Sequence, residues 1–211
     1  MGTLLPAERA VVKALLASSL THDKIWSGTS WTVPAATTTE RNDIKKRIKD
    51  FLLIKQEKYC YYCGFSFEFR NGLKGIRGIH LDHIAPKHNH RDQIFGTKNL
   101  ILACSKCNSA DYKGSKDTVL KKVAAYKDWE FSIIHPYLDT FSDHLQLYDD
   151  GSLRLVKSSS KGRATKAMFG LDESMMVQLR SCCLMFDAHE VDDLSELKIR
   201  RITKKNLTSH R

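Results

Sequence analysis

The chain has 211 residues, which suffices for one domain of ordinary size or for a small catalytic module with flanking elements. Its net charge of +10 is concentrated in residues 41–122, which contain 18 Lys and Arg against 8 Asp and Glu. This basic zone predicts a polyanionic partner, because Lys and Arg displace counterions from phosphates. No run of about 18 apolar residues is present, and residues 1–20 lack the apolar core of a signal peptide. We therefore expect a soluble, cytoplasmic protein with no membrane partner.

Cysteine usage points to metal ligands instead of disulfides. Four of the six cysteines form two C-x-x-C pairs, at residues 60–63 and 104–107. Pairs of this kind are typical of thiolate ligands in a reducing compartment. The remaining two, Cys182 and Cys183, are adjacent and are expected to be reduced side chains on a helix.

The first part of the chain predicts two helices joined by a connector. Apolar residues at spacings of three and four after Pro6 predict a helix over about 6–20. Residues 21–39 are rich in Ser, Thr and Gly and predict an irregular connector, anchored by two tryptophans. Thr37-x-x-Glu40 has the spacing of a capping box, and a helix to about Gln56 follows. Its polar face carries Arg41, Lys45, Lys46 and Lys49. That face can either lie along a phosphate backbone or be solvated.

The central part predicts strands followed by a helix. Strict alternation over 65–70 before Asn71-Gly72 predicts a strand and a turn. A second strand is expected over 79–84 and a polar loop over 87–96. A third strand is predicted over 99–103, and a helix begins near Cys104.

The last part predicts a helix, a hairpin and a second helix. Residues 118–129 are expected to form an amphipathic helix, and residues 144–156 form a hairpin around Asp149-Asp-Gly151. A polar loop is expected over 158–163 and a helix over 171–187. Residues 198–211 contain six Lys or Arg and no acid, which predicts a basic tail or a final helix.

The two cysteine pairs predict a structural zinc site. Cys60, Cys63, Cys104 and Cys107 fit one tetrahedral Zn²⁺ per chain with an all-thiolate shell. Such a closed shell leaves no open position for a substrate. The ion is expected to clamp the start of the first strand to the helix near Cys104.

Between the cysteine pairs lies a cluster with catalytic potential. Asp82 and Asn108 offer hard oxygen ligands for Mg²⁺ or Mn²⁺. His83 can act as general base, and Asn99 can hold the imidazole or its loop in place. Each residue alone is ordinary, since a strand Asp or His is commonly a surface group. Their combination at these positions relative to the cysteines favours a catalytic site.

These residues resemble a known family. Leu81-Asp82-His83-Ile84-x-Pro86, Asn99-Leu100 and Cys104-x-x-Cys107-Asn108 are similar to the HNH (ββα-metal, His-Me finger) endonucleases that carry an additional C-x-x-C zinc site. The resemblance covers roughly residues 58–116. It implies His83 as general base, Asp82 and Asn108 as ligands of the catalytic divalent ion, and Asn99 as the residue that orients His83. It also implies the four cysteines as structural zinc ligands.

The sequence departs from this family at two positions. The family usually places a Lys three residues after the metal-binding Asn, whereas Lys113 follows Asn108 by five. Together with Lys87 and Lys106, Lys113 is predicted to contact nucleic acid. His80 stands where many members carry Glu and is expected to support the ligands from outside the metal's shell.

The C-terminal portion resembles a narrower group. The order and spacing of several short motifs are similar to the region that follows the HNH core in Septu-type and retron-associated defence nucleases. They are His135-Pro-Tyr-Leu-Asp139, Asp143-His144-Leu, Asp150-Gly151, Gly162-Arg-Ala-Thr165, and Gly170-Leu-Asp172 through Leu179-Arg180. The resemblance implies an ABC-type ATPase partner subunit and a role in anti-phage defence.

Together these observations predict an α+β fold with a small ββα-metal HNH core stapled by zinc, flanking helices, and a C-terminal hairpin plus helix. The predicted units are a helical region over 1–57, the core over 58–117 and an accessory region over 118–211. The predicted function is metal-dependent cleavage of phosphodiester bonds in DNA. Three alternatives stay open: an RNA or tRNA nuclease, since no residue distinguishes the 2′-hydroxyl, a non-catalytic zinc-ribbon binding protein, and a homing or restriction nuclease that acts alone.

Overall fold

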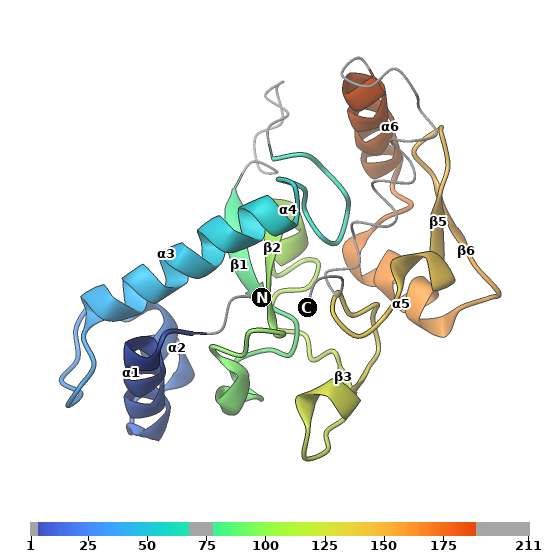
Figure 1. Cartoon of the computed structure of the whole chain (residues 1–211). Coiled ribbons are helices and arrows are strands. Elements are labelled where there is room, and N and C mark those ends of the chain that lie inside the picture. The colour runs from blue at the N-terminus through green and yellow to red at the C-terminus, as the bar shows by residue number, and fades with distance from the viewer. Residues whose placement is uncertain (1–3, 68–77, 189–211) are drawn as a thin grey trace.

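Helices and two-stranded sheets make up the protein, seen in Figure 1 as a computed structural model that describes residues 4–67 and 78–188. The α-helices are α1 (Pro6–Ala17), α2 (His22–Ser27), α3 (Thr38–Lys55), α4 (Ser105–Asn108), α5 (Ser160–Phe169) and α6 (Ser174–Ala188). The short 3₁₀ turns are η1 (Arg91–Gln93), η2 (Tyr126–Asp128) and η3 (Phe141–Asp143). The strands are β1 (Ile79–His83), β2 (Leu100–Cys104), β3 (Val119–Lys121), β4 (Glu130–Phe131), β5 (Leu145–Leu147) and β6 (Leu153–Leu155). They pair antiparallel as β1–β2, β3–β4 and β5–β6, which agrees with the predicted α+β class.

Strand β2 lies at the centre of the molecule and belongs to two cores. All five of its residues are buried. Successive side chains of a strand point to opposite faces, and here Leu100 and Leu102 join α1, α2 and α3 in one core. Ile101 and Ala103 join the cysteine loop and the C-terminal region in the other. Figure 1 accordingly shows α1–α3 on one side of the β1–β2 ribbon, with α5, α6 and the β5–β6 hairpin on the other.

The two predicted N-terminal helices are present, and the second starts at the predicted cap. Thr37 Oγ1 accepts a hydrogen bond from the Glu40 backbone N–H at 3.2 Å, and the Glu40 carboxylate accepts one from the Thr37 N–H at 2.9 Å. Two of the first unpaired donors of α3 are therefore satisfied reciprocally. The apolar side of α3 buries Ile44, Ile48 and Leu52. The first helix ends at Ala17, three residues before the predicted end.

The connector over 21–39 is only partly irregular, which corrects the prediction. Thr21 caps the short helix α2 by accepting a hydrogen bond from the Lys24 N–H at 3.2 Å. Ile25 of α2 is fully buried, and Trp26 packs against the same core. This single turn of helix places Trp26 beside the end of β1.

The predicted helix over 118–129 is wrong, because this segment forms β3 and η2. Thr118 is fully buried and donates its hydroxyl to the Ile84 carbonyl at 2.6 Å, while its own carbonyl accepts from the Ser132 N–H at 2.8 Å. Asp117 Oδ1 accepts from the Val119 N–H at 3.0 Å. The first two of these hydrogen bonds tie Thr118 to distant segments, and the second occupies the Thr118 carbonyl that a helix would have used.

The C-terminal hairpin is confirmed, but the polar loop predicted over 158–163 is wrong. Ser159 caps α5 by accepting a hydrogen bond from the Gly162 N–H at 3.0 Å, so the helix begins inside the predicted loop. Gly170 ends α5 with φ +56°, a left-handed conformation that costs glycine little. The last predicted helix is present as α6.

Two predictions extend outside the described residues. Of the strand predicted over 65–70, residues 65–67 are described and contain only an isolated bridge between Ser66 and Tyr59. The rest of that strand, its turn at 71–72 and the tail at 198–211 lie outside. The proposed boundaries after residues 57 and 117 remain predictions, and one hydrophobic core extends across the first of them while the other extends across the second.

Candidate active site and metal centre

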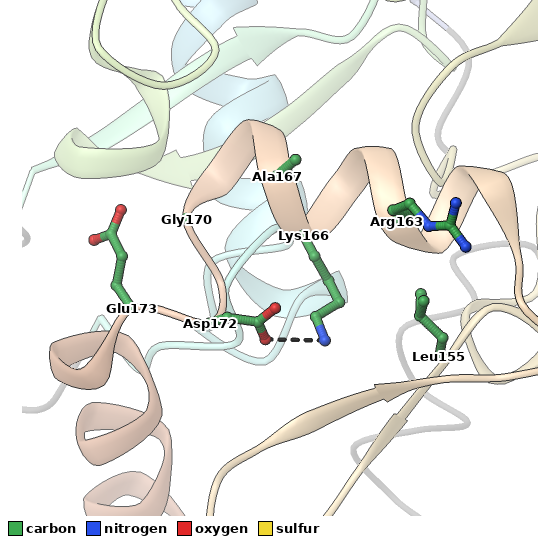
Figure 2. Close-up of a pocket in the computed structure, with 7 residues that line it drawn as sticks. All are labelled: Leu155, Arg163, Lys166, Ala167, Gly170, Asp172 and Glu173. Carbon is green, nitrogen blue, oxygen red and sulfur yellow. Dashed lines mark ion pairs between the residues drawn. The ribbon is translucent and has the colours of Figure 1, made fainter.

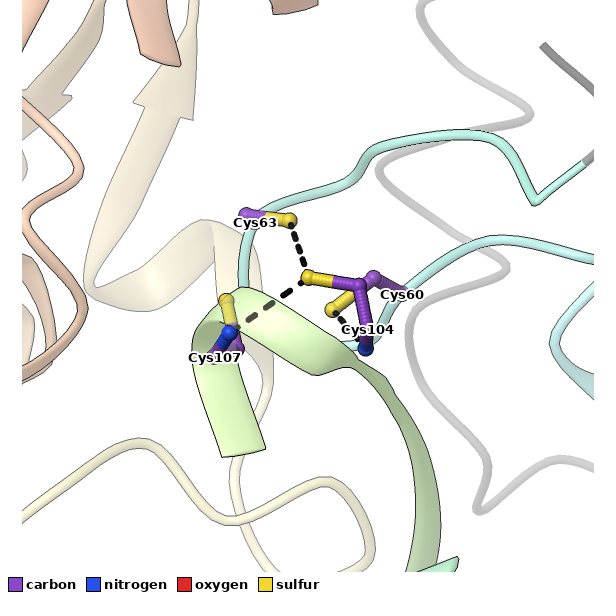
Figure 3. Close-up of side chains that lie close together, drawn as sticks. All are labelled: Cys60, Cys63, Cys104 and Cys107. Carbon is purple, nitrogen blue, oxygen red and sulfur yellow. Dashed lines mark hydrogen bonds between the residues drawn. The ribbon is translucent and has the colours of Figure 1, made fainter. Parts of the chain in front are cut away.

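Four cysteines from two separate segments meet beside the β1–β2 ribbon (Figure 3). Cys60 and Cys63 lie in the loop after α3, Cys104 ends β2, and Cys107 lies in α4. Their sulfur atoms all lie within 4.8 Å of one another, and all four residues are buried. A tetrahedral ion with Zn–S bonds of about 2.3 Å needs sulfur separations of roughly 3.8 Å, and the Cys63 and Cys104 sulfurs are 3.9 Å apart. The predicted cluster is confirmed, and its geometry and donor type fit zinc.

The local electrostatics also fit a bound dication. The Cys104 N–H points to the Cys60 sulfur at 3.3 Å, and the Cys107 N–H to the Cys104 sulfur at 3.5 Å. Burial opposes ionisation of Cys60, but hydrogen bonds from the other three cysteines lower its pKa well below the ordinary value. Hydrogen bonds with Cys104 raise the pKa values of Cys63 and Cys107. A bound metal ion would stabilise all four as thiolates.

Asp82 is held directly by the cysteine loop. The residue lies in β1 and is 4% exposed. The Tyr62 hydroxyl donates to its Oδ2 at 2.5 Å, and the Lys113 Nζ lies 3.4 Å from its Oδ1. Burial raises the pKa of the Asp82 carboxyl, while the Lys113 charge and the Tyr62 hydrogen bond oppose that rise. Since Tyr62 lies between Cys60 and Cys63, the metal centre and the carboxylate are connected through a single side chain.

His83 ends β1 with its ring orientation fixed. Its Nε2 lies 3.0 Å from the Ile94 carbonyl oxygen, and its ring meets Trp26 edge-on at a centroid distance of 4.4 Å. Because a carbonyl oxygen only accepts, Nε2 carries the ring proton. Burial lowers the pKa of His83 to about 3. Three positive charges act in the same direction, those of Lys113, Lys87 and Lys45. The imidazole is therefore neutral at neutral pH, with its lone pair on Nδ1.

Asn99 fixes the two segments that orient His83. Its side chain is fully buried just before β2. Its Oδ1 accepts from the Ala85 N–H at 2.7 Å, and its Nδ2 donates to the carbonyls of Ala85 and Gln93, both at 3.0 Å. Ala85 follows His83 by two residues, and Gln93 precedes the Ile94 carbonyl that receives the His83 proton. Asn99 thus acts on the loops around the imidazole.

Asn108 is the last residue of α4, directly after Cys107 of the cysteine cluster. Helix α4 contacts both β1 and β2, so Asn108 and Asp82 lie on neighbouring elements. The Asn108 amide has no hydrogen-bond partner within residues 4–67 and 78–188. A carboxylate and a free amide oxygen are a donor set that suits a hard divalent cation. Their role as metal ligands remains a prediction.

The order of these residues in the chain matches a known family. The family model described as HNH endonuclease matches residues 60–114. Residues 60–114 are an HNH endonuclease domain. The match spans about a quarter of the chain and includes the four cysteines, Asp82, His83, Asn99 and Asn108. The protein is therefore a nuclease, a hydrolase that acts on nucleic acid. Comparison with curated proteins gives no match.

Lys113 of the HNH domain is buried, whereas the predicted contact with nucleic acid requires an exposed side chain. It is 1% exposed and pairs with Asp82, so in this conformation it cannot contact a phosphate on the surface. The Lys113 N–H bonds to the Cys107 carbonyl at 3.3 Å. The structure thus makes Lys113 the cationic partner of the predicted metal ligand.

This pairing leads to a prediction about metal binding. Changing Lys113 to methionine leaves the Asp82 carboxylate buried without its cation, which is expected to lower the free energy of unfolding by about 3 kcal/mol. Added Mg²⁺ should restore more stability in this variant than in the wild type, because the ion replaces the missing charge. Thermal unfolding with and without Mg²⁺ measures this. Lys106→Met is the matched control, since Lys106 is also poorly exposed but pairs with Glu173. An equal Mg²⁺ effect in all three proteins would contradict the prediction.

The other two lysines predicted to contact nucleic acid are also paired. The Nζ of Lys87 lies 2.7 Å from the Asp23 carboxylate. The Nζ of Lys106 lies 3.0 Å from Glu173 and 3.6 Å above the Tyr112 ring. Lys87 keeps a 27% exposed side chain, whereas that of Lys106 is 9% exposed. Of the three, Lys87 alone keeps the exposure that a phosphate contact needs.

His80 links the two elements that carry the predicted metal ligands. Its Nε2 lies 3.0 Å from the Ser105 hydroxyl at the start of α4, while the residue itself is in β1. This position suits the expected supporting role, which remains a prediction.

The basic face of α3 is mostly used within the protein. Arg41 and Lys45 donate to carbonyl oxygens of α2 and the residue after it at 2.9–3.1 Å, and Lys49 donates to the Ile79 carbonyl at 3.1 Å. Burial, and to a lesser extent the Arg41 charge, lower the pKa of Lys45 to about 8. Neither predicted use of the face describes these three side chains, since they attach α2 and β1 to α3. Lys46 remains on the surface and pairs with Asp50.

Three side chains of the site were not predicted from the sequence. Tyr62 holds Asp82, Trp26 packs against His83, and Tyr126 donates to Asn99 Oδ1 at 2.9 Å. For Tyr62 a signal existed, because it lies inside a cysteine pair whose loop must approach β1. For Tyr126 none existed, since its segment has no pattern linking it to residue 99.

A separate pocket lies between α5, β6 and the start of α6 (Figure 2). Its lining includes Arg163, Lys166 and Asp172, and Lys166 pairs with Asp172 at 2.9 Å. It contains none of the catalytic candidates.

Among the described helices, none is long and apolar enough to cross a bilayer.

Proposed function

We propose that the HNH domain hydrolyses phosphodiester bonds in DNA in a reaction that depends on Mg²⁺ or Mn²⁺. The observation that carries this proposal is the state of His83. It is a neutral imidazole whose Nε2 is tied to the Ile94 carbonyl, next in sequence to the buried carboxylate of Asp82. A base and a hard cation ligand at adjacent positions suit attack on phosphorus.

The proton transfer is assigned to His83. With the ring proton on Nε2, the lone pair of Nδ1 can take a proton from a water molecule as that water attacks phosphorus in line with the leaving oxygen. Nδ1 has no hydrogen-bond partner among the described residues. Asn99 and the Ile94 carbonyl hold the ring in this tautomer and orientation, which lowers the cost of reaching the transition state.

Asp82 and Asn108 are the proposed ligands of the catalytic cation. The position beside Asp82 already accommodates a positive charge, because the Lys113 ammonium lies 3.4 Å from Oδ1. When bound there, a divalent ion would stabilise the charge that develops on the phosphate and on the leaving oxygen. The four cysteines are proposed to bind a separate structural Zn²⁺ ion.

DNA is proposed as the substrate class, and RNA is the alternative to be tested. The excess of positive charge in residues 41–122 supports binding to any phosphate backbone, but it does not discriminate between sugars. A single domain with one general base is suited to cutting one strand in each binding event. Double-strand breaks would then need two copies or two visits.

A defence role with an ABC-type ATPase partner is a further part of this proposal. It rests on the C-terminal motifs that resemble Septu-type and retron-associated nucleases. Several of these motif residues hold the C-terminal region together, which supports reading them as one unit. Arg180 donates to the Gly151 carbonyl at 2.7 Å, and Asp139 pairs with Lys161 at 2.7 Å. Copurification of the coexpressed ATPase with this chain is the expected result.

The test of the proposed function is cleavage of supercoiled plasmid and of total tRNA by the purified protein with Mg²⁺ or Mn²⁺. We expect nicked or linear plasmid, no product without a divalent ion, and intact tRNA. Cleavage of tRNA alone would replace DNA by RNA. If neither is cut although about one zinc is bound per chain, the assay is repeated with the ATPase. Continued inactivity would contradict the proposed function.

A further inference from the structure

A chain of hydrogen bonds enters the HNH domain from residues outside it. The Tyr126 hydroxyl lies 2.9 Å from Asn99 Oδ1 and 3.1 Å from His135 Nε2. His135 is fully buried, and its Nδ1 accepts from the Tyr137 N–H at 3.2 Å. Tyr126, His135 and Tyr137 all follow residue 114, where the family match ends.

The direction of these hydrogen bonds is fixed by their chemistry. Because the Tyr137 N–H can only donate, His135 Nδ1 is the acceptor, and in the neutral ring the proton lies on Nε2. Burial lowers the pKa of His135 to about 3, which agrees with a neutral ring. His135 Nε2–H therefore donates to the Tyr126 oxygen. The Tyr126 hydroxyl proton is left to donate to Asn99 Oδ1.

Tyr126 completes the hydrogen bonding of Asn99. The amide offers two donors and two acceptor positions. Its donors go to the carbonyls of Ala85 and Gln93, and its oxygen accepts from the Ala85 N–H and from Tyr126. Every position is thus filled, so the amide cannot turn over without leaving buried groups unpaired. Unpaired buried groups are costly.

We infer that Tyr126 is a positioning residue for the general base His83 and acts through Asn99. The inference rests on the proposed function of His83. Asn99 holds Ala85, two residues after His83, and Gln93, one residue before the carbonyl that binds His83 Nε2. By fixing the orientation of the Asn99 amide, Tyr126 fixes the two backbone segments, at Ala85 and at Gln93, that orient the imidazole. The catalytic unit accordingly extends beyond the HNH domain to the segment that carries η2.

The test compares two tyrosine-to-phenylalanine variants. Tyr126→Phe removes the hydroxyl but keeps the ring contacts with Trp129 and Phe131. Tyr112→Phe is the control, since it also removes one hydroxyl hydrogen bond, the one that Tyr112 donates to the Glu173 carboxylate at 3.0 Å, and that bond lies outside the Asn99 network. We expect Tyr126→Phe to lower kcat about tenfold with KM unchanged, and Tyr112→Phe to change kcat less than about twofold. Equal losses in the two variants would overturn the inference.

Two further measurements separate positioning from general stability. In an Asn99→Ala background, Tyr126→Phe should have no additional effect on kcat, because its route to His83 is already lost. The ¹⁵N spectrum of His83 reports the tautomer without substrate or activity. It should show a single Nε2-protonated form in the wild type and in Tyr112→Phe, and a mixture or broadened signals in Tyr126→Phe. An unchanged His83 spectrum in Tyr126→Phe overturns the relay even if the wild type cuts no substrate, whereas an inactive wild type with a changed spectrum contradicts only the proposed function.

Discussion

Replacing His83 with alanine is expected to lower the rate of phosphodiester cleavage by about 10²–10⁴-fold, the usual contribution of a general base. The change removes the imidazole that is proposed as the base at the end of β1. The fold should survive, because the main loss is one hydrogen bond to the Ile94 carbonyl, worth roughly 1–3 kcal/mol when that carbonyl stays buried. Single-turnover cleavage of plasmid, beside circular dichroism and a binding assay, measures the effect.

His90→Ala is the matched control for this prediction. His90 is also buried, at 7% exposure against 6% for His83, and it lies on the same connection between β1 and β2. Its Nε2 pairs with Asp117 at 3.2 Å, and its ring lies near Trp129, so it stabilises the loop without entering the site. We expect His90→Ala to lose stability and keep most of the cleavage rate. A loss of DNA binding equal to the loss of cleavage in His83→Ala would remove His83 from the role of base.

Features set by neighbouring residues were predictable from the sequence. The capping box at Thr37 and Glu40 is a local contact and starts α3 where predicted. The C-x-x-C spacing places two thiolates on one turn, so the cluster needs only that the two turns meet. The apolar run over 99–103 predicts a strand, and β2 is present there with both of its faces buried. The two partners of the capping box and the two cysteines of each pair lie within a few residues of one another.

Features set by distant partners were not predictable. Residues 118–129 have apolar spacings that suit a helix, but Thr118 bonds to Ile84 and Ser132 and draws the segment into a strand. In the sequence, the lysines of α3 suit a solvated or phosphate-binding face. In the structure, Lys45 and Lys49 donate to carbonyl oxygens of α2 and β1. Tyr126 carries no mark of its role, because the Asn99 amide that it locks is 27 residues away. The sequence therefore indicated the reacting groups better than the groups that orient them.

Loss of the proposed zinc ion is expected to destabilise the centre of the protein and to abolish cleavage at the same time. We expect Cys60→Ser to lower the melting temperature by at least about 10 °C, which corresponds to roughly 4 kcal/mol for a chain of this length. The reason is that a structural zinc ion contributes directly to the folding free energy, and without it the buried thiol groups of the cluster lose the ion that would bind them together. Thermal unfolding, with zinc content measured on the same samples, checks this.

Cleavage should be lost in Cys60→Ser for a specific geometric reason. Tyr62, between the first two ligands, donates to Asp82 at 2.5 Å, so releasing the loop releases the carboxylate proposed to bind the catalytic ion. Excess Mg²⁺ should therefore not restore activity, even below the melting temperature of the variant. Cys183→Ser is the matched control: Cys183 is equally buried but lies in α6, outside the cluster. It should keep both zinc and cleavage. If Cys60→Ser also kept full cleavage, the zinc loop and the active site would be independent, and the link through Tyr62 would be wrong.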